Sequence, residues 1–186
     1  MSLIRGRGKG GGGGNSSISG IADYNDYETS INPITLIADT WTTLTNNGLG
    51  SSTNLSYLPS GVTNLMDTST GYFDFSELNL GDNCFIRNDF SVTPDTNNSL
   101  LELRYQLGGT GNIYTLETTL GRLDSGSGKP YRYSLAPQMI YMGDLNTKDN
   151  PILLQIKLST NGSVVNSGSS IGVIKRWLLY IEISML

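Results

Sequence analysis

The sequence of 186 residues contains no histidine, a single cysteine and few charged residues, which make up 15% of the chain. Without histidine, the chain cannot build a Ser-His-Asp catalytic site, an imidazole general base or the usual zinc and iron sites that use His ligands. Cys84 cannot form a disulfide within the chain, and its place in an alternating apolar run predicts that it packs as a small hydrophobic residue. We therefore expect no enzymatic activity, no cofactor and no bound metal.

Long apolar runs are also missing. None approaches the roughly 18 to 20 residues needed to span a bilayer, and the N-terminus lacks the apolar stretch of a secretory signal peptide. We expect synthesis in the cytoplasm and no membrane partner.

Negative charge is unevenly distributed along the chain. Residues 1–20 hold three basic residues and no acidic one, whereas the other 166 residues hold nine basic and sixteen acidic residues, a net charge of −7. A basic arm with three charges on an acidic body suits a nucleic-acid duplex poorly, because affinity for phosphates needs several neutralising contacts. Nucleic acid is therefore not an expected partner.

The basic segment is dense in glycine, which loses much backbone entropy on folding and buries no side chain. We predict an extended attachment arm over residues 1–20 and one domain over residues 21–186. In an extended arm Arg5, Arg7 and Lys9 project to one side about 7 Å apart, which suits a groove lined with carboxylates. The five glycines that follow can approach a foreign backbone closely, and the apolar pair near the start needs an apolar pocket. The arm residues predicted to bind the partner are Leu3, Ile4, Arg5, Arg7, Lys9, Gly10, Gly11, Gly12, Gly13 and Gly14.

The rest of the chain shows the period-two alternation of half-buried strands. Eight to ten short strands separated by Gly and Asn turns predict an all-β domain, an antiparallel β-sandwich of the jelly-roll type with the Gly-rich arm attached. The clearest strands are 84–92, 101–107 and 152–158. Further candidates cover residues 34–38, 41–44, 72–75, 113–120, 132–142 and 163–173.

The strands 84–92 and 101–107 are separated by a polar turn, so the sequence favours an antiparallel hairpin between them. With Phe90 opposite Leu103, both apolar sets share one face and Asp89 lies beside Arg104. Charge complementarity favours this register over a slip by two residues.

The last segment, residues 176–185, is apolar on parts of both faces. Trp177 and Leu179 can fill the sandwich core, which leaves Leu178 and Tyr180 for a second buried surface. Burial of that surface on a threefold axis predicts a homotrimer.

Other motifs have simple structural explanations. Residues 125–130 resemble a phosphate-binding loop, but Leu123 and Pro130 stand where glycine and Ser or Thr are required. The acidic residues Asp74, Glu77, Asp82 and Asp89 could form a calcium site or a carboxylate pair for glycoside hydrolysis, yet their spacing is that of turn and surface residues. The many tyrosines could stack on sugars, although in a β-protein most pack in the core and its rim.

The run 71–90, GYFDFSELNLGDNCFIRNDF, resembles a stretch of the jelly-roll proteins found on tailed-phage particles. Those are head decoration or fibre proteins, commonly trimeric, with a topology similar to tumour-necrosis-factor and C1q heads, and they carry no catalytic residues. The arm of this chain lacks the Gly-X-Y period or heptads of a long fibre stalk.

The resemblance implies a structural virion protein on the particle surface, a capsid decoration or cement protein or a head fibre, made in the host cytoplasm. Its partner would be the major capsid protein or another virion structural protein. The alternative is the receptor- or glycan-binding tip domain of a phage tail fibre, with a glycan as ligand. A hydrolase with paired carboxylates is a third hypothesis.

Overall fold

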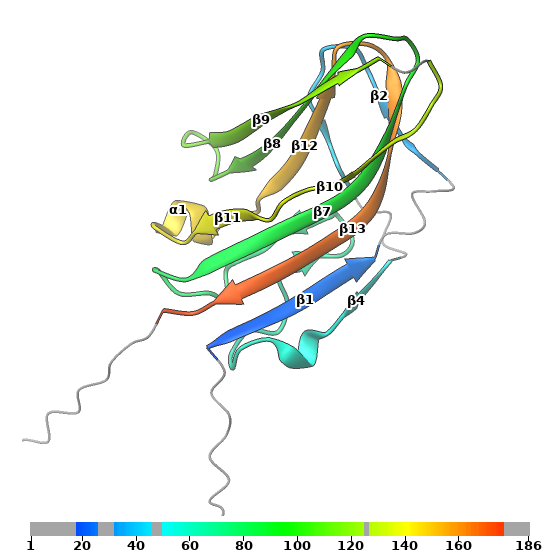
Figure 1. Cartoon of the computed structure of the whole chain (residues 1–186). Coiled ribbons are helices and arrows are strands. Elements are labelled where there is room, and N and C mark those ends of the chain that lie inside the picture. Colours follow the sequence, from blue (N-terminus) through cyan, green and yellow to red (C-terminus); the bar gives the residue numbers. More distant parts are fainter. Residues whose placement is uncertain (1–17, 26–31, 46–49, 125–126, 177–186) are drawn as a thin grey trace, which may run out of the picture.

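The computed structural model describes residues 18–25, 32–45, 50–124 and 127–176. Two antiparallel sheets pack face to face over these residues, as Figure 1 shows. The predicted all-β sandwich is confirmed.

The larger sheet comprises β1 (Ser19–Asn25), β2 (Ile34–Leu36), β4 (Ser51–Thr53), β7 (Asn83–Pro94), β10 (Tyr131–Ser134), β11 (Gln138–Tyr141) and β13 (Gly162–Ile174). Its strand order is β10-β7-β13-β1-β4, and β11 also pairs with β7 while β2 pairs with β13. We call it the seven-stranded sheet. Its two longest strands, β7 and β13, run antiparallel along almost their whole length.

The smaller sheet has the order β3-β12-β8-β9 and is called the four-stranded sheet. Its strands are β3 (Thr42–Thr43), β8 (Ser99–Leu107), β9 (Tyr114–Leu123) and β12 (Leu153–Leu158). A short pair, β5 (Met66–Asp67) and β6 (Tyr72–Phe73), the 3₁₀ turn η2 (Leu55–Tyr57) and the one-turn helix α1 (Leu145–Lys148) complete the described elements.

Buried residues alternate with outward-facing ones along the strands, and the buried side chains fill the core between the sheets. In β7 every even residue from Cys84 to Pro94 is buried, and in β8 every odd residue from Ser99 to Leu107 is buried. Their apolar side chains meet those of β12 and β13 in one continuous core. Burial of apolar area at about 25 cal/mol per Å² is the main force that holds the two sheets together.

The predicted hairpin between 84–92 and 101–107 is wrong. β7 pairs with β10, β11 and β13, whereas β8 pairs with β9 and β12, so the turn after β7 carries the chain from one sheet to the other. Asp89 therefore does not lie beside Arg104; it pairs with Arg87 at 3.0 Å, while Arg104 pairs with Glu117 at 3.4 Å. Two strands that face one core from opposite sheets have the same alternation as two strands of one hairpin, so the pattern does not distinguish them.

Asn88, the polar residue that interrupts the apolar face of β7, joins the two sheets. It is buried, its Nδ2 donates a hydrogen bond to the Tyr105 hydroxyl of β8, and its Oδ1 accepts one from Ser169 Oγ of β13 at 2.7 Å. Burial raises the pKa of Tyr105 well above its usual value, so this hydroxyl stays protonated and able to hydrogen-bond.

The other predicted strands are recovered with adjusted bounds. The candidate over 132–142 is divided into β10 and β11, with Pro137, which cannot donate to a strand ladder, in the break between them. Sequence analysis did not anticipate β1, β4 or α1. The predicted strand over 176–185 falls, apart from Arg176, outside the described residues.

Candidate functional site

The arm residues predicted to bind a partner, and the predicted interface residues Leu178 and Tyr180, lie outside the described residues. Both predictions therefore stay predictions. The described chain nevertheless fixes the points from which these segments leave. Ser19 at the start of β1 lies opposite Ile174 at the end of β13, so both leave from the same end of the seven-stranded sheet (Figure 1).

An apolar patch lies on the outer face of that sheet, at the same end. Met139 of β11 pairs with Phe85 of β7, Phe85 pairs with Gly172 of β13, and Gly172 pairs with Ile21 of β1. Successive partners in antiparallel strands carry their side chains on the same face. Two residues further along the strands, the next row brings Tyr141 of β11 and Ile174 of β13 to this face. We call Ile21, Phe85, Met139, Tyr141 and Ile174 the apolar row.

The apolar row is open to solvent in the single chain. Four of its members are between 43% and 54% exposed, and Phe85 is half-buried. Gly172 keeps the centre of the row flat, since it carries no side chain. Contiguous exposed apolar side chains on adjacent strands are typical of a surface that is covered in an assembly.

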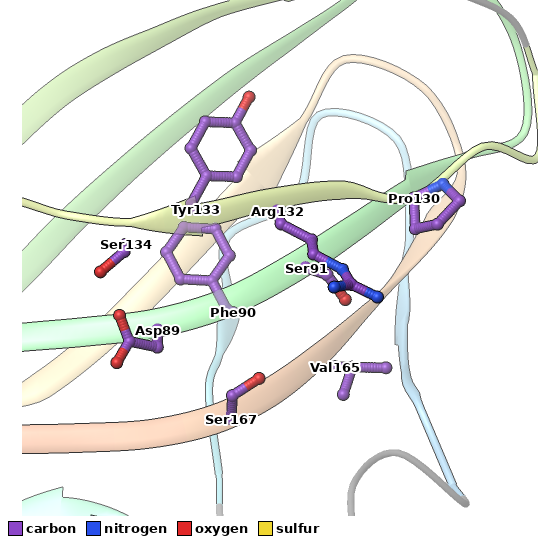
Figure 2. A pocket seen from close by; sticks show the side chains of 9 residues that line it. All are labelled: Asp89, Phe90, Ser91, Pro130, Arg132, Tyr133, Ser134, Val165 and Ser167. Carbon is purple, nitrogen blue, oxygen red and sulfur yellow. The ribbon is translucent and has the colours of Figure 1, made fainter.

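The other half of the same outer face is polar. An open cavity of about 760 Å³ lies there over β7, between β10 and β13. We call it the polar trough. As Figure 2 shows, it is lined by Asp89, Phe90, Ser91, Pro130, Arg132, Tyr133, Ser134, Val165 and Ser167.

A β-bulge in β13 shapes the trough. Asn166 pairs with Phe90 and Gly168 pairs with Asp89, so Ser167 has no partner in β7 and its exposed side chain joins the trough lining. Gly168 makes the bulge possible, because its φ is +122° and a Cβ there would lie 2.0 Å from the Tyr24 carbonyl oxygen.

The polar groups of the trough retain hydrogen-bonding capacity. Asp89 bonds to Arg87 through Oδ2, while its Oδ1 is buried and makes no hydrogen bond. Arg132 is exposed and, within the described part of the chain, makes no ion pair or hydrogen bond. These groups could therefore bind a polar ligand.

The outer face of the four-stranded sheet is different, because four of its charged side chains form ion pairs and Arg122 hydrogen-bonds to Asn98. Lys157 pairs with Glu102 at 2.7 Å and Arg104 with Glu117 at 3.4 Å. Both cations also lie over the Trp41 ring, with Arg104 Cζ 4.2 Å and Lys157 Nζ 4.7 Å from its centroid. Such cation–π contacts contribute roughly 0.5 to 1 kcal/mol each at exposed sites.

Three of the four carboxylates considered for catalysis or calcium binding, Asp74, Glu77 and Asp82, have structural roles. Asp82 is buried and accepts hydrogen bonds from Asn79 N at 2.9 Å and Arg176 N at 2.7 Å, which ties the end of β13 to the turn before β7. Glu77 accepts a hydrogen bond from the Thr63 hydroxyl at 2.7 Å, and this bond is the main reason that its pKa is lowered.

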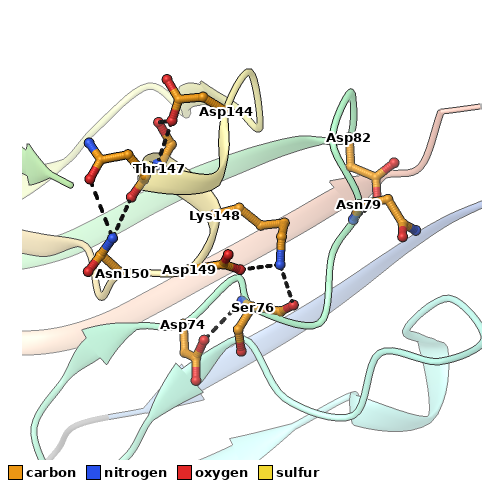
Figure 3. A network of polar contacts seen from close by, with 10 residues as sticks. Asp74, Ser76, Asn79, Asp82, Asp144, Thr147, Lys148, Asp149 and Asn150 are labelled. Atoms are coloured by element: carbon orange, nitrogen blue, oxygen red, sulfur yellow. Dashed lines mark hydrogen bonds and ion pairs between the residues drawn. The ribbon is translucent and has the colours of Figure 1, made fainter. Parts of the chain in front are cut away.

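Asp74 lies with Asp67 and Asp149 around a cavity of about 250 Å³, and Figure 3 shows part of this polar network. Asp74 accepts a hydrogen bond from Ser76 N at 2.9 Å, and Asp149 forms an ion pair with Lys148. Hydrogen bonds from Ser69 lower the pKa of Asp67. Within the described ranges, no group of three potential ligand side chains is arranged to hold a metal ion.

The single cysteine has the predicted environment. Cys84 is fully buried in the core, and burial raises the pKa of its thiol. The reactive thiolate is therefore strongly disfavoured.

Sequence reasoning missed both the apolar row and the polar trough. A signal for the row was present, since Phe85 is a large apolar residue at an outward position of β7, between the polar outward residues Asn83 and Arg87. For the trough no such signal existed. Its lining comes from β10 and β13, which lie on either side of β7 only because of long-range strand pairing.

The sequence matches no protein-family model and no curated protein. The fold, however, is shared with solved structures. Eiger, a tumour necrosis factor from S. frugiperda, aligns over 91% of this chain and 100% of its own with a TM-score of 0.50 and 10% identity. At that identity the likeness concerns the fold alone, an antiparallel jelly-roll sandwich.

Looser likenesses, with TM-scores of 0.46 and 0.38, are found to chains from infectious bursal disease virus Gx strain and from its T13 viral particle. Both are 12% identical over 86% of this chain, which spans about a third of their length. At these TM-scores they carry no argument about function. Within the described ranges, no helix has the length and apolar character needed to cross a bilayer.

Proposed function

We propose that this protein is a structural component of a virus particle, a capsid decoration or cement protein or a head fibre, built from a jelly-roll body and attached through its N-terminal arm. The virion role rests on the resemblance of residues 71–90 to jelly-roll proteins of tailed-phage particles. The acidic side chains in that run are engaged in turns and ion pairs. This engagement agrees with a binding role rather than with catalysis by paired carboxylates.

The observation that carries the assembly part of the proposal is the apolar row. Its side chains extend across four adjacent strands and are exposed in the single chain. Covering them would gain about 25 cal/mol for each Å² of apolar area removed from water, against the cost of association. A second copy of the chain is the proposed cover, in a homotrimer that Leu178 and Tyr180 extend beyond the end of β13.

The attachment part of the proposal assigns the arm to the capsid. Arg5, Arg7 and Lys9 would meet carboxylates of the major capsid protein or another virion structural protein, while Leu3 and Ile4 would enter an apolar pocket. The glycines from Gly10 to Gly14 would add backbone hydrogen bonds to a neighbouring sheet edge. The virion surface is then the expected location.

Deletion of residues 1–14 tests the attachment. The truncated protein is expected to keep its oligomeric mass but to lose binding to empty heads that lack this protein, measured by co-sedimentation. A charge-only variant, in which the three basic arm residues become glutamine, should bind with intermediate affinity, because its apolar and backbone contacts remain. Unchanged saturation of heads by the truncated protein would refute the attachment role.

A further inference from the structure

The polar trough is the strongest feature of the molecule that assembly and attachment leave without a role. It lies on the same outer face as the apolar row, but Asp89 is four residues further along β7 than Phe85, a distance of about 13 Å at the strand rise. Covering the apolar row therefore does not require filling the trough.

We infer that the polar trough binds a sugar unit that carries a carboxylate, as part of an acidic glycan. The trough combines hydroxyl groups and an unpaired cation around one open cavity of about 760 Å³. This volume lies within the range of small-molecule sites in proteins.

The charge of the trough selects an anion. Asp89 is already neutralised by Arg87 at 3.0 Å, whereas Arg132 has no ion-pair partner among the described residues. A net positive charge therefore remains in the trough, although the body of the protein is acidic. A guanidinium binds a carboxylate through two parallel hydrogen bonds, which gives such a contact both strength and orientation.

The other polar groups suit the hydroxyl groups of a sugar. The hydroxyls of Ser91, Ser134 and Ser167 make no hydrogen bond within the described part of the chain, and each can both donate and accept. Figure 2 shows Ser134 beside Asp89 and Arg132 beside Ser91, so these groups surround one space rather than separate ones.

Apolar and aromatic residues complete the lining, namely Val165, Pro130, Phe90 and Tyr133. Val165 and Pro130 stand on opposite sides of β7, on β13 and just before β10, and they offer surface to the C–H groups of a sugar ring. A bare anion would use only the guanidinium. The hydroxyls and this apolar surface are what favour a sugar.

The inference goes beyond the proposed structural role, because it adds recognition of a surface glycan to a particle protein. A single sugar in an open site binds weakly. Several copies of the trough on one particle would raise the overall affinity for a polysaccharide by multivalency, without any new contact.

The test titrates the purified full-length protein with glucuronic acid, glucose, acetate and inorganic phosphate, followed by NMR. We expect glucuronic acid to bind in the millimolar range, at least tenfold more tightly than glucose or acetate, and to bind more weakly as salt is raised. Polysaccharides rich in uronic or sialic acid should be retained on an array, whereas neutral polysaccharides should not.

Three variants locate the site. Arg132→Gln should remove the preference for glucuronic acid over glucose, and Ser167→Ala at the exposed bulge should weaken both sugars. Arg122→Gln, which removes the same charge from β9 of the other sheet, is the matched control and should leave binding unchanged.

Several results would overturn the inference. Equal affinity for acetate, phosphate and glucuronic acid would mean a plain anion site. Absence of binding by any sugar or acidic polysaccharide would remove the ligand class altogether. Binding that survives Arg132→Gln, or that is lost equally in Arg122→Gln, would place any sugar site elsewhere. None of these measurements uses heads, so their failure is distinguishable from failure of the proposed attachment.

Discussion

The outer faces of the two sheets differ in how many of their charged side chains have partners within the chain and in how much apolar surface they expose. On the four-stranded sheet, Arg104 and Lys157 each have a carboxylate partner and share the Trp41 ring. On the seven-stranded sheet, one half exposes the apolar row and the other half holds Arg132, which has no partner among the described residues. A surface whose charges pair with one another is stable in contact with water. Exposed apolar side chains and unpaired charges instead favour the binding of a partner.

This contrast explains why the net charge of the chain says little about its partners. Both sheets contribute to the same acidic body, yet the apolar row and Arg132 lie on the outer face of one of them. The arrangement of side chains on each face, rather than their total, determines what the face can bind.

The largest effect is expected on assembly. Ile21→Glu combined with Met139→Glu puts two charges into the apolar row, and burying them without partners is costly. We expect the oligomer to dissociate to monomers at micromolar concentration, measured by light scattering, while the far-ultraviolet circular dichroism is unchanged.

The control for that pair is Ile37→Glu, since Ile37 is 62% exposed and lies outside the row. It should leave the mass unchanged. If the double variant keeps its oligomeric mass, or if the wild-type protein is itself a monomer at micromolar concentration, the assembly role of the apolar row is wrong.

The next effect concerns the buried contact that joins the two sheets. Asn88→Ala leaves the Tyr105 hydroxyl and Ser169 Oγ without the partner that each has in the native protein. Unpaired buried polar groups destabilise a protein by roughly 1 to 3 kcal/mol, so urea unfolding should move to lower denaturant concentration by a corresponding amount.

Removing both ends of that contact provides the control. The double variant Asn88→Ala with Tyr105→Phe should recover part of the loss, because no hydroxyl oxygen then remains without its donor at residue 105. A double variant that loses the full sum of the two single effects would show that Asn88 and Tyr105 are not energetically coupled.

The smallest effect is expected on the face with paired charges. Trp41→Leu removes the ring from two cations and should cost about 1 kcal/mol, measured by urea unfolding at low salt. The oligomeric mass should stay the same, because this face has no part in the proposed assembly. A change in mass would remove the distinction between the two outer faces.

Local pattern recognition located most strands because burial on one side imposes a period of two. It placed Cys84, Ile86, Phe90 and Val92 on the buried side of β7 correctly. The pairing of β7 with β8 was predicted wrongly for the same physical reason, since facing strands of two sheets bury the same alternate residues as neighbours in one sheet. Charge complementarity between Asp89 and Arg104 could not correct this, because each has another partner within its own sheet.

The candidate surfaces were less accessible to sequence reasoning. Phe85 and Ile21 are 64 residues apart in the sequence, and they meet across β13 only because both pair with Gly172. The trough likewise needs the bulge at Ser167 to bring a hydroxyl beside residues of β7 and β10.

By itself the sequence determined the fold class, the absence of histidine chemistry and the inert environment of Cys84, because these depend on composition and on short-range alternation. Only the tertiary structure decided which strands share a sheet, that Asn88 is a buried link between the sheets, and that the unsatisfied groups gather on one outer face. The reason is that strand pairing is fixed by long-range hydrogen bonds and core packing, which residues near one another in the chain do not specify.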